Sequence, residues 1–382
     1  MNLYAFELGR KKELCLAELI AVLGQENLME RNLDTAIFEL KDFQPQKLQD
    51  SLGGTIKIIQ IIGPSDQSKL SKQIEKELEN EFKGRTGKIP FSVSALSYKN
   101  IQEINIKQIL NFSKIFLKSL GLNSRFVNKN FQNTRPSTIY KAKVVEKGID
   151  INIIKGEHHI WLGKTVAIQN IDAYSKRDYE KPARDARVGM TPPKLAQIMI
   201  NLAGPSKTIY DPFCGTGTYL MEAMIMGKKA IGSDLEPRMV AMSEKNCQWL
   251  KSQFHAPSDF RVFERDARFI PEELINDKID TIITEGYLGT PVTKTPSPEE
   301  REKTFRELAN LHLNWLTSAT KILKKGGKIV MCVAAFRTKS GIEHLPHFEQ
   351  LVETAGYKII ASHQYERKEQ VVTRDIAILE KK

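Results

Sequence analysis

The second half of the chain alternates short apolar strands with helices, and this alternation restricts the possible folds more than any other feature. Strands are predicted at 208–210, 230–233, 260–263, 281–284, 329–333, 357–363 and 375–379, and helices at 192–203, 218–226, 238–251 and 297–327. Strands that alternate with helices in this way form a mostly parallel sheet covered on both faces. The pattern therefore predicts an α/β, Rossmann-like domain from residue 190 to residue 382.

A glycine-rich turn follows the first of these strands. It reads Asp211-Pro212-Phe213-Cys214-Gly215-Thr216-Gly217-Thr218 and leads directly into a helix. In an open parallel sheet a ligand binds beyond the carboxyl end of such a strand. Gly215 and Gly217 let the backbone approach that ligand, and the amides of the helix start favour an anionic group such as the carboxylate of a methionine moiety. Leu220 stands where the dinucleotide fingerprint has its third glycine, so we do not predict that fingerprint.

Acidic residues follow three successive strands of the predicted sheet. Asp211 ends the first strand, Asp234 the second, and Asp266 follows the third. Each alone is typical of a helix start, but together they meet at one sheet edge and favour an adenosine. Asp234 is placed to accept both ribose hydroxyls, with Glu236 as a less favoured substitute, and Asp266 to accept from the adenine amino group.

The fourth strand ends in Thr284-Glu285-Gly286-Tyr287-Leu288-Gly289. An adenosine joined to a methionine moiety through a sulfonium would carry a transferable methyl group. The same edge of the sheet places this segment beside that group. Glu285 can accept hydrogen bonds from a substrate amine and orient its lone pair for in-line attack, which is mainly a positioning effect. Tyr287 can stack on a base that has left its helix. The alternative is an ordinary strand-end carboxylate with an aromatic residue at the rim.

The net charge of +11 is concentrated in the middle of the chain. Residues 69–170 contain 18 Lys and Arg but 8 Asp and Glu, and there is no acidic residue between Glu103 and Glu146. A solvated lysine-rich face would also account for a charge run. The lack of balancing acids, with interleaved Asn, Ser, Thr and aromatic residues, favours binding to the phosphates of a nucleic acid. The basic residues that we assign to RNA binding are Lys107, Lys114, Arg125, Lys129, Arg135 and Lys141.

The first 170 residues mix strands and helices without regular alternation. Strands are predicted at 3–8, 35–40, 56–62, 89–96, 125–128, 141–145, 151–154 and 160–162, the last two as a hairpin, and helices at 13–23, 70–82 and 104–120. We expect a ferredoxin-like α+β domain at 1–66, a basic domain at 67–170 and a charged linker at 171–189. Thr191 is predicted to cap the helix that opens the last domain, and Ser297 and Glu300 to form a capping box for a long helix that ends at Gly326-Gly327.

Composition excludes several classes of protein. The four cysteines, Cys15, Cys214, Cys247 and Cys332, are widely separated, which argues against a CxxC zinc site and against a disulfide framework. We therefore expect reduced thiols and no bound metal. The N-terminus lacks the basic start and unbroken apolar run of a signal peptide, and no apolar stretch is long enough to span a membrane. These features predict a cytoplasmic protein that does not bind membranes.

Four stretches of this sequence resemble one known family, the THUMP-domain tRNA guanine-N2 methyltransferases of archaea and eukaryotes and their bacterial relatives. The stretches are Tyr4–Arg10 with Glu13–Leu19, Arg184–Gln197, Asp211–Thr218 and Gly232–Val240. The resemblance implies a class I methyltransferase domain that uses S-adenosylmethionine, preceded by a smaller ferredoxin-like and THUMP region that grips the acceptor stem of tRNA. The cofactor-binding residues that we then assign are Thr191, Asp211, Cys214, Gly215, Gly217, Asp234 and Asp266.

The catalytic motif departs from that family. The family has Asp-Pro-Pro-Tyr, in which the acid and a main-chain carbonyl accept hydrogen bonds from the guanine amino group, and this chain lacks both prolines. Either Glu285 replaces the aspartate, or Thr284 takes its place and Tyr287 matches the tyrosine. Gly286 also leaves the loop more freedom than proline would. The resemblance supports binding of cofactor and RNA more strongly than it supports guanine methylation.

The leading hypothesis is a tRNA methyltransferase that acts on an exocyclic base amine, with guanine N2 as the expected target. In this hypothesis Glu285 and Tyr287 place the base, and the released proton goes to Glu285 or to water. Two alternatives remain open. One is an RNA-binding protein with a catalytically silent methyltransferase domain, suggested by the lost prolines. The other is a DNA amine methyltransferase, because a related motif also serves adenine and cytosine.

Overall fold

The computed structural model describes residues 2–100, 103–185, 191–269, 274–275, 279–366 and 370–382. The chain forms two compact units, Met1–Ala173 and Tyr174–Lys382. Within the described residues no helix has the length and apolar character that crossing a membrane requires. Part of the predicted entry into the last domain, residues 186–190, lies outside the described residues.

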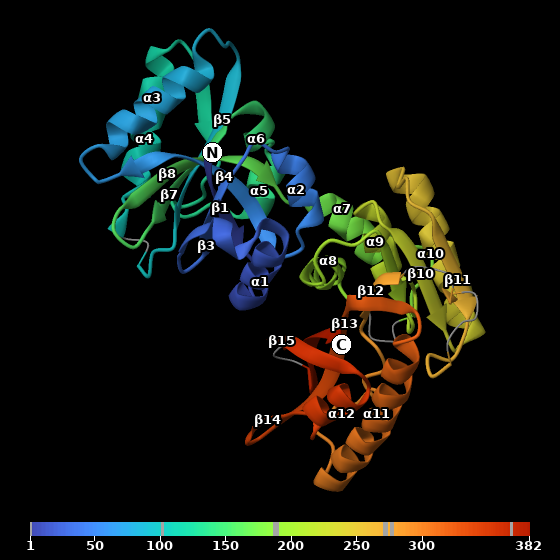
Figure 1. Cartoon of the computed structure of the whole chain (residues 1–382). Helices are drawn as coiled ribbons and strands as arrows, with labels where there is room; N and C mark the ends of the chain where they lie inside the picture. Colours follow the sequence, from blue (N-terminus) through green and yellow to red (C-terminus); the bar gives the residue numbers. More distant parts are fainter. Residues whose placement is uncertain (1, 101–102, 186–190, 270–273, 276–278, 367–369) are drawn as a thin grey trace. The chain divides into compact units, whose positions relative to one another are not determined.

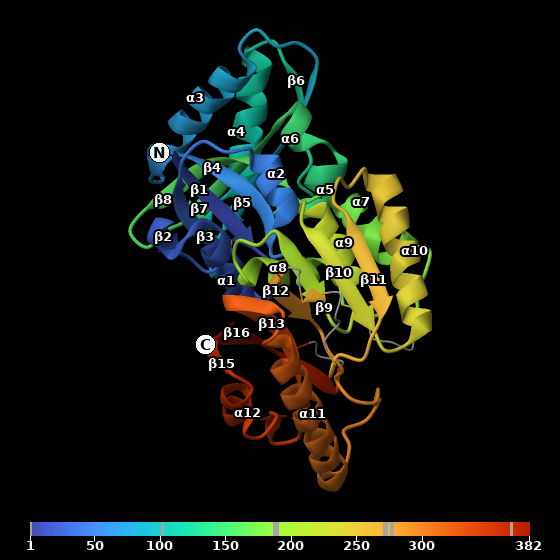
Figure 2. The ribbon, with the colours of Figure 1, turned by 45° about the vertical axis from the view of Figure 1, so that its right-hand side comes forward.

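The first unit is built on one mixed sheet of eight strands in the order β2-β3-β1-β4-β8-β7-β5-β6. The strands are β1 (Asn2–Leu8), β2 (Leu28–Arg31), β3 (Thr35–Leu40), β4 (Thr55–Ser65), β5 (Lys88–Leu96), β6 (Asn123–Phe126), β7 (Ile149–Lys155) and β8 (Ile160–Ile168). The helices are α1 (Lys12–Leu23), η1 (Gln25–Asn27), α2 (Pro45–Ser51), α3 (Leu70–Phe82), α4 (Ile106–Ser119), α5 (Pro136–Lys141), α6 (Val144–Lys147) and α7 (Ile171–Ser175), the last spanning the division between the units. Figure 2 shows α3 and α4 side by side, and their apolar faces pack on β5 and β7.

A single sheet joins the two segments that the sequence led us to separate at residue 66. Strand β8 returns to lie antiparallel to β4, so that Gln60 faces Lys164. A buried charge network reinforces this junction, because Nζ of Lys57 on β4 donates to Oδ2 of Asp150 on β7 at 2.8 Å. Long-range strand pairing of this kind has no local sequence signature, whereas the predicted hairpin of β7 and β8 does, and that hairpin is confirmed.

The strand predicted at 141–145 is wrong. Two short helices, α5 and α6, occupy this region, and Lys143 between them has a φ of 51°. Ile139 and Val144 are buried in one small cluster with Ile168, while Lys141 and Lys143 stay exposed. The alternating exposure of residues 141–144 thus arises from two short helices that meet at the left-handed Lys143, and a sequence pattern cannot distinguish it from the alternation of a strand.

The second unit confirms the Rossmann-like prediction. Its sheet has the order β11-β10-β9-β12-β13-β16-β15, with β14 paired to β13. The strands are β9 (Thr208–Asp211), β10 (Lys229–Asp234), β11 (Phe260–Glu264), β12 (Ile279–Thr284), β13 (Leu323–Thr338), β14 (Gly341–Glu343), β15 (Tyr357–Tyr365) and β16 (Val372–Lys381). Strands β9 to β13 pair in parallel, and β16 runs antiparallel to both of its neighbours.

Helices cover both faces of this sheet. They are η3 (Lys176–Glu180), α8 (Pro193–Leu202), α9 (Thr218–Ile225), α10 (Pro237–Phe254), α11 (Pro298–Ala319) and α12 (Phe348–Thr354). Figure 1 shows α8, α9 and α10 on one face and α11 and α12 on the other. The capping box of Ser297 and Glu300 is confirmed, but α11 ends at Ala319 instead of Gly326, and Gly326 lies in β13. The N-cap of α8 is Pro192, so the prediction that Thr191 caps this helix is wrong.

Residues 174–185, predicted as part of a linker, pack into the second unit. Nε of Arg177 donates to Oε1 of Glu222 on α9 at 2.6 Å, and both side chains are buried. The backbone of Ala183 exchanges two hydrogen bonds with the side chain of Asn246 on α10, which also donates to the carbonyl of Thr216. This charged segment is therefore a structural part of the second unit and supports its glycine-rich turn.

Candidate functional site

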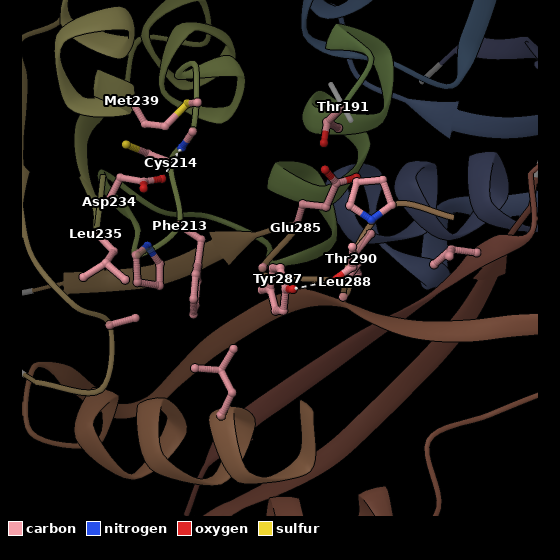
Figure 3. A pocket seen from close by; sticks show the side chains of 18 of the residues that line it. Thr191, Phe213, Cys214, Asp234, Leu235, Met239, Glu285, Tyr287, Leu288 and Thr290 are labelled. Atoms are coloured by element: carbon pink, nitrogen blue, oxygen red, sulfur yellow. Dashed lines mark hydrogen bonds between the residues drawn. The ribbon is translucent and has the colours of Figure 1, made fainter. Parts of the chain in front are cut away.

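A cavity of about 930 Å³ lies at the carboxyl edge of the parallel strands in the second unit. Its lining comes from the turn after β9, the ends of β10, β11 and β12, the loop after β12 and the start of β16. Figure 3 shows two ends, with Asp234, Leu235 and Met239 at one and Glu285, Tyr287 and Leu288 at the other. This volume is in the upper range for small-molecule sites and holds more than one flat ring system.

The glycine-rich turn forms the floor between these two ends. Gly215 lines the cavity with a φ of 51°, and a Cβ placed there would meet no atom within 4 Å. Gly217 does not line the cavity. It has a φ of 82°, and a Cβ on it would lie 2.5 Å from Oγ of Ser243 on α10. The two glycines thus serve different needs, because Gly215 leaves space for a ligand and Gly217 lets α9 and α10 pack closely.

Asp211 lies beneath the turn and does not line the cavity. Its carboxylate is fully buried, and Oδ1 accepts a hydrogen bond from the amide of Phe213 at 3.1 Å. Burial raises the pKa of Asp211 to about 7, although the Thr284 hydroxyl and the Phe213 amide oppose this shift. The structure therefore gives Asp211 a role in shaping the turn rather than a direct contact with a ligand in the cavity.

Asp234 borders the cavity and is tied to the turn. Oδ2 accepts from the amide of Gly215 at 2.9 Å, and Oδ1 accepts from the amide of Glu236 at 3.0 Å. Burial raises the pKa of Asp234, and the two amides counteract it. The carboxylate is fixed by these bonds and keeps lone pairs that can accept hydrogen bonds from a ligand. Glu236, the less favoured candidate, also lines the cavity.

Asp266 lines the same end but is paired with a neighbour. Nε of Arg268 donates to Oδ1 of Asp266 at 3.1 Å and to Oδ2 at 2.9 Å, and Nη2 donates to Oδ2 at 2.5 Å. These bonds hold the pKa of Asp266 below its usual value. Arg268 is also part of the lining, so a flat ring at this end would meet a guanidinium as well as the predicted acid.

Glu285 and Thr284 are the two candidates for the position of the family's catalytic aspartate, and the structure places them differently. Thr284 is fully buried, lies outside the cavity lining, and its hydroxyl accepts from the amide of Gly286 at 3.0 Å. Glu285 lines the cavity, and its Oε1 accepts from Nε of Arg374 on β16 at 2.7 Å. This placement favours Glu285 as the group that meets a substrate.

The loop after Glu285 takes a course that prolines cannot. Gly286 and Gly289 have φ values of 67° and 91°, in the left-handed region that favours glycine. Between them Tyr287 lines the cavity and remains 47% exposed. An aromatic ring in this position is accessible to a flat ring of a ligand, and stacking on a base stays a prediction.

Thr191 and Cys214, also assigned to the cofactor, both line the cavity. Thr191 lies near Glu285 in Figure 3, and Cys214 lies near Asp234. All four cysteines of the chain are free and buried, in agreement with the expectation of reduced thiols. Of the seven predicted cofactor residues, five line one cavity, and Asp211 and Gly217 support it from below.

The predicted RNA-binding residues all belong to the first unit and are exposed. Lys107 and Lys114 lie on α4 and Arg125 on β6, while Lys129, Arg135 and Lys141 follow on the next segment. Nζ of Lys107 lies 5.2 Å from the ring centre of Phe131, whose ring is itself 39% exposed. In the part of the chain that the structure describes, none of the six forms an ion pair with an acidic side chain. Their charge is therefore available to an anionic partner.

Comparisons with known proteins show which family this chain belongs to. The RMKL-like methyltransferase domain family matches residues 183–345. The tRNA (guanine(10)-N2)-dimethyltransferase of Methanothermobacter thermautotrophicus is 33% identical over 50% of this chain and 50% of its own length. A probable enzyme of the same name from Methanothermococcus thermolithotrophicus is 30% identical, and the match covers 77% of that relative. The chain belongs to the tRNA (guanine(10)-N2) methyltransferase family.

The matches cover different shares of the relatives and of this chain. The match spans about half the length of the first two relatives, 50% and 48%. The solved structure of TrmN from Thermus thermophilus aligns with the whole chain at 15% identity and a TM-score of 0.55. This likeness shows that the present protein has the same fold as TrmN.

A DNA methylase family matches residues 34–245. That match includes the glycine-rich turn and Asp234 but ends before Glu285, so it concerns the end of the cavity formed by Asp234, Leu235 and Met239.

Arg374 is one residue of the cavity lining that sequence reasoning missed. Our search followed the carboxyl ends of the predicted strands, where parallel strands bring side chains together. Strand β16 is antiparallel to β13, so its first residues reach that edge instead of its last. An arginine near the start of the last predicted strand was the available signal, but its use depends on knowing the direction of β16.

Proposed function

We propose that the protein transfers a methyl group from S-adenosylmethionine to an exocyclic base amine of tRNA, with guanine N2 as the target. The observation that carries this proposal is the single cavity that joins the fixed carboxylate of Asp234 to the carboxylate of Glu285. Family membership supports the tRNA substrate, because several relatives are named tRNA (guanine(10)-N2) methyltransferases. Free buried cysteines support action in the cytoplasm.

The residues at the adenosine end fit this cofactor. The open space above Gly215 is a cradle that a side chain would fill, and Asp234 offers a fixed acceptor for ribose hydroxyls. The exposed side chain of Leu235 provides an apolar cover for the adenine, and Asp266 provides an acceptor for its amino group. When bound, S-adenosylmethionine supplies an electrophilic methyl group on a sulfonium sulfur.

The residues at the other end suit an amine nucleophile. Glu285 accepts a hydrogen bond from the exocyclic amine and thereby directs its lone pair toward the methyl group. Tyr287 stacks on the base and holds its plane. S-adenosylmethionine would supply the methyl group to that amine, and the proton that the amine then releases would go to Glu285 or to water. Arg374 keeps the Glu285 carboxylate in place during these steps.

Transfer of labelled methyl groups to tRNA tests the proposal. Wild-type protein should methylate tRNA from cells that lack it, and mass spectrometry of the nucleosides should reveal N2-methylguanosine. Glu285→Ala should reduce kcat at least about 100-fold, since it removes the positioning acceptor, while the exposed Glu302→Ala should behave as wild type. Tyr287→Phe should keep activity that Tyr287→Ala loses. Absence of transfer by folded, cofactor-binding wild-type protein would support the silent RNA-binding alternative instead.

The DNA methylase match favours one second candidate, a DNA amine methyltransferase. The exposed basic residues of the first unit bind phosphates of either nucleic acid. Competition between tRNA and duplex DNA in the same transfer assay separates the candidates. We expect tRNA to accept methyl groups and DNA to accept none; methylated adenine or cytosine in the DNA would reverse this assignment.

A further inference from the structure

The base end of the cavity contains a charged pair that the proposed reaction does not fully use. Arg374 lines the cavity beside Glu285, and the two side chains are 10% and 15% exposed. Orienting a carboxylate requires one or two donors, and a neutral donor would suffice. A nearly buried guanidinium is a costly way to achieve this alone, because removing an ion from water carries a large penalty.

The donors of Arg374 are divided among different partners. Nε donates to Oε1 of Glu285 at 2.7 Å, and Nη1 donates to Oε1 of Gln370 at 3.0 Å. Among the described residues none accepts a hydrogen bond from Nη2. Gln370 also lines the cavity, so the guanidinium is held on two sides by groups of the site itself. A fixed arginine with a donor to spare is suited to reading an acceptor on a ligand.

We propose that Arg374, held by Gln370, recognises O6 of the target guanine and makes the site selective for that base; this proposal rests on the proposed function. The pair presents an acceptor, the Glu285 carboxylate, next to a donor, the Arg374 guanidinium. The Watson–Crick edge of guanine carries two neighbouring donors, N2–H and N1–H, followed by the acceptor O6. A carboxylate takes both donors and the guanidinium takes O6.

Other bases match this pair less well. Adenine and cytosine each have one exocyclic amine beside a ring nitrogen that is an acceptor, so that nitrogen would face the carboxylate with no proton between them. A site that hydrogen-bonds its substrate rejects an analogue that leaves a buried polar group unpaired. Val371 and Val372, which also line this end, exclude water that would otherwise compensate.

The test replaces the target guanosine with 2-aminopurine riboside, which keeps the 2-amino group but lacks O6 and the N1 proton. The tRNA is assembled from synthetic strands, with an abasic residue opposite the target so that base pairing is equal. We expect wild-type kcat/KM to favour guanosine at least about 100-fold. Arg374→Met should lower this ratio about 10-fold or more, and Gln370→Met should lower it to a smaller extent.

The controls separate recognition from structure. Arg301 forms a comparable half-buried pair with Glu343 at 2.7 Å outside the cavity lining, so Arg301→Met should leave the ratio unchanged. Calorimetry with S-adenosylmethionine verifies that each variant is folded. If Arg374→Met slows both substrates equally, the arginine only positions Glu285 and the proposal is overturned. If wild-type protein methylates neither the guanosine tRNA nor the 2-aminopurine tRNA, the proposed function fails. If it methylates both equally well, the proposed function stands and the recognition of O6 by Arg374 is overturned.

Discussion

The backbone amide of Gly215 donates a 2.9 Å hydrogen bond to Oδ2 of Asp234, and this bond joins the turn after β9 to the end of β10. One carboxylate thus holds the glycine-rich turn in shape and lines the end of the cavity that we propose binds the adenosine. A change at Asp234 should therefore affect the binding of cofactor rather than the binding of RNA.

Substituting Asp234 with asparagine should weaken the binding of S-adenosylmethionine. Asparagine has one acceptor oxygen where aspartate has two, and it lacks the charge that strengthens bonds to ribose hydroxyls. We expect Kd to rise about 10- to 100-fold, or about 1.4 to 3 kcal/mol. Calorimetry measures this, and Asp259→Asn, a change at an exposed residue just before β11, is the control. An unchanged Kd in a folded Asp234→Asn protein contradicts the assignment.

Asp211 should make stability depend on pH. Its pKa of about 7 lies above the usual 3.8, so the folded protein keeps a proton that the unfolded chain has lost between these values. The free energy of unfolding should fall as pH rises from about 4 to about 7 and then become level with respect to this group. The total change is at most about 4 kcal/mol, because one pKa unit corresponds to about 1.4 kcal/mol.

Comparison with Asp211→Asn isolates this contribution. The variant has no titrating group at position 211, so the difference in free energy of unfolding between wild type and variant should decrease through the same pH window. Urea denaturation at several pH values gives that difference. A constant difference from pH 4 to pH 8 would mean that the buried carboxyl ionises normally.

The buried pair of Arg177 and Glu222 should anchor residues 174–185 to the second unit. Arg177→Met leaves the Glu222 carboxylate buried without its cation, and we expect a loss of about 3 to 5 kcal/mol in the free energy of unfolding. Combining it with Glu222→Leu should recover most of that loss, since an apolar pair replaces the ion pair. Thermal and urea unfolding check both variants. A double variant as unstable as the single one would show that the pair is not the cause.

Local patterns were sufficient to predict most of the second unit. The alternation of strands and helices, the turn at Asp211–Thr218 and the capping box at Ser297 each depend on residues that are close in sequence. The acids at strand ends were also predictable, because parallel strands bring their carboxyl ends together. Asp234 and Asp266 accordingly meet in one cavity with Glu285.

What could not be predicted depends on pairing between distant segments. The contact of Arg374 with Glu285 requires β16 to be antiparallel, and the single sheet of the first unit requires β8 to return beside β4. The burial of Asp211 could not be predicted either. Its position in the motif suggested a contact with the ligand, but the fold buries it beneath the turn. The domain division predicted at residue 66 stays a prediction about folding units, although the two segments share a sheet.

Binding of RNA by the first unit should depend on salt through the exposed basic residues. Each cation that contacts a phosphate releases counterions, so log K falls with log salt in proportion to the number of contacts. Lys107→Ala should weaken binding of tRNA to a similar extent for different tRNA sequences and reduce the slope by about 0.7 to 0.9. Lys47, an exposed lysine on α2 outside the basic segment, provides the control. Filter binding at several salt concentrations gives both slopes, and equal slopes for Lys107→Ala and wild type would remove Lys107 from the interface.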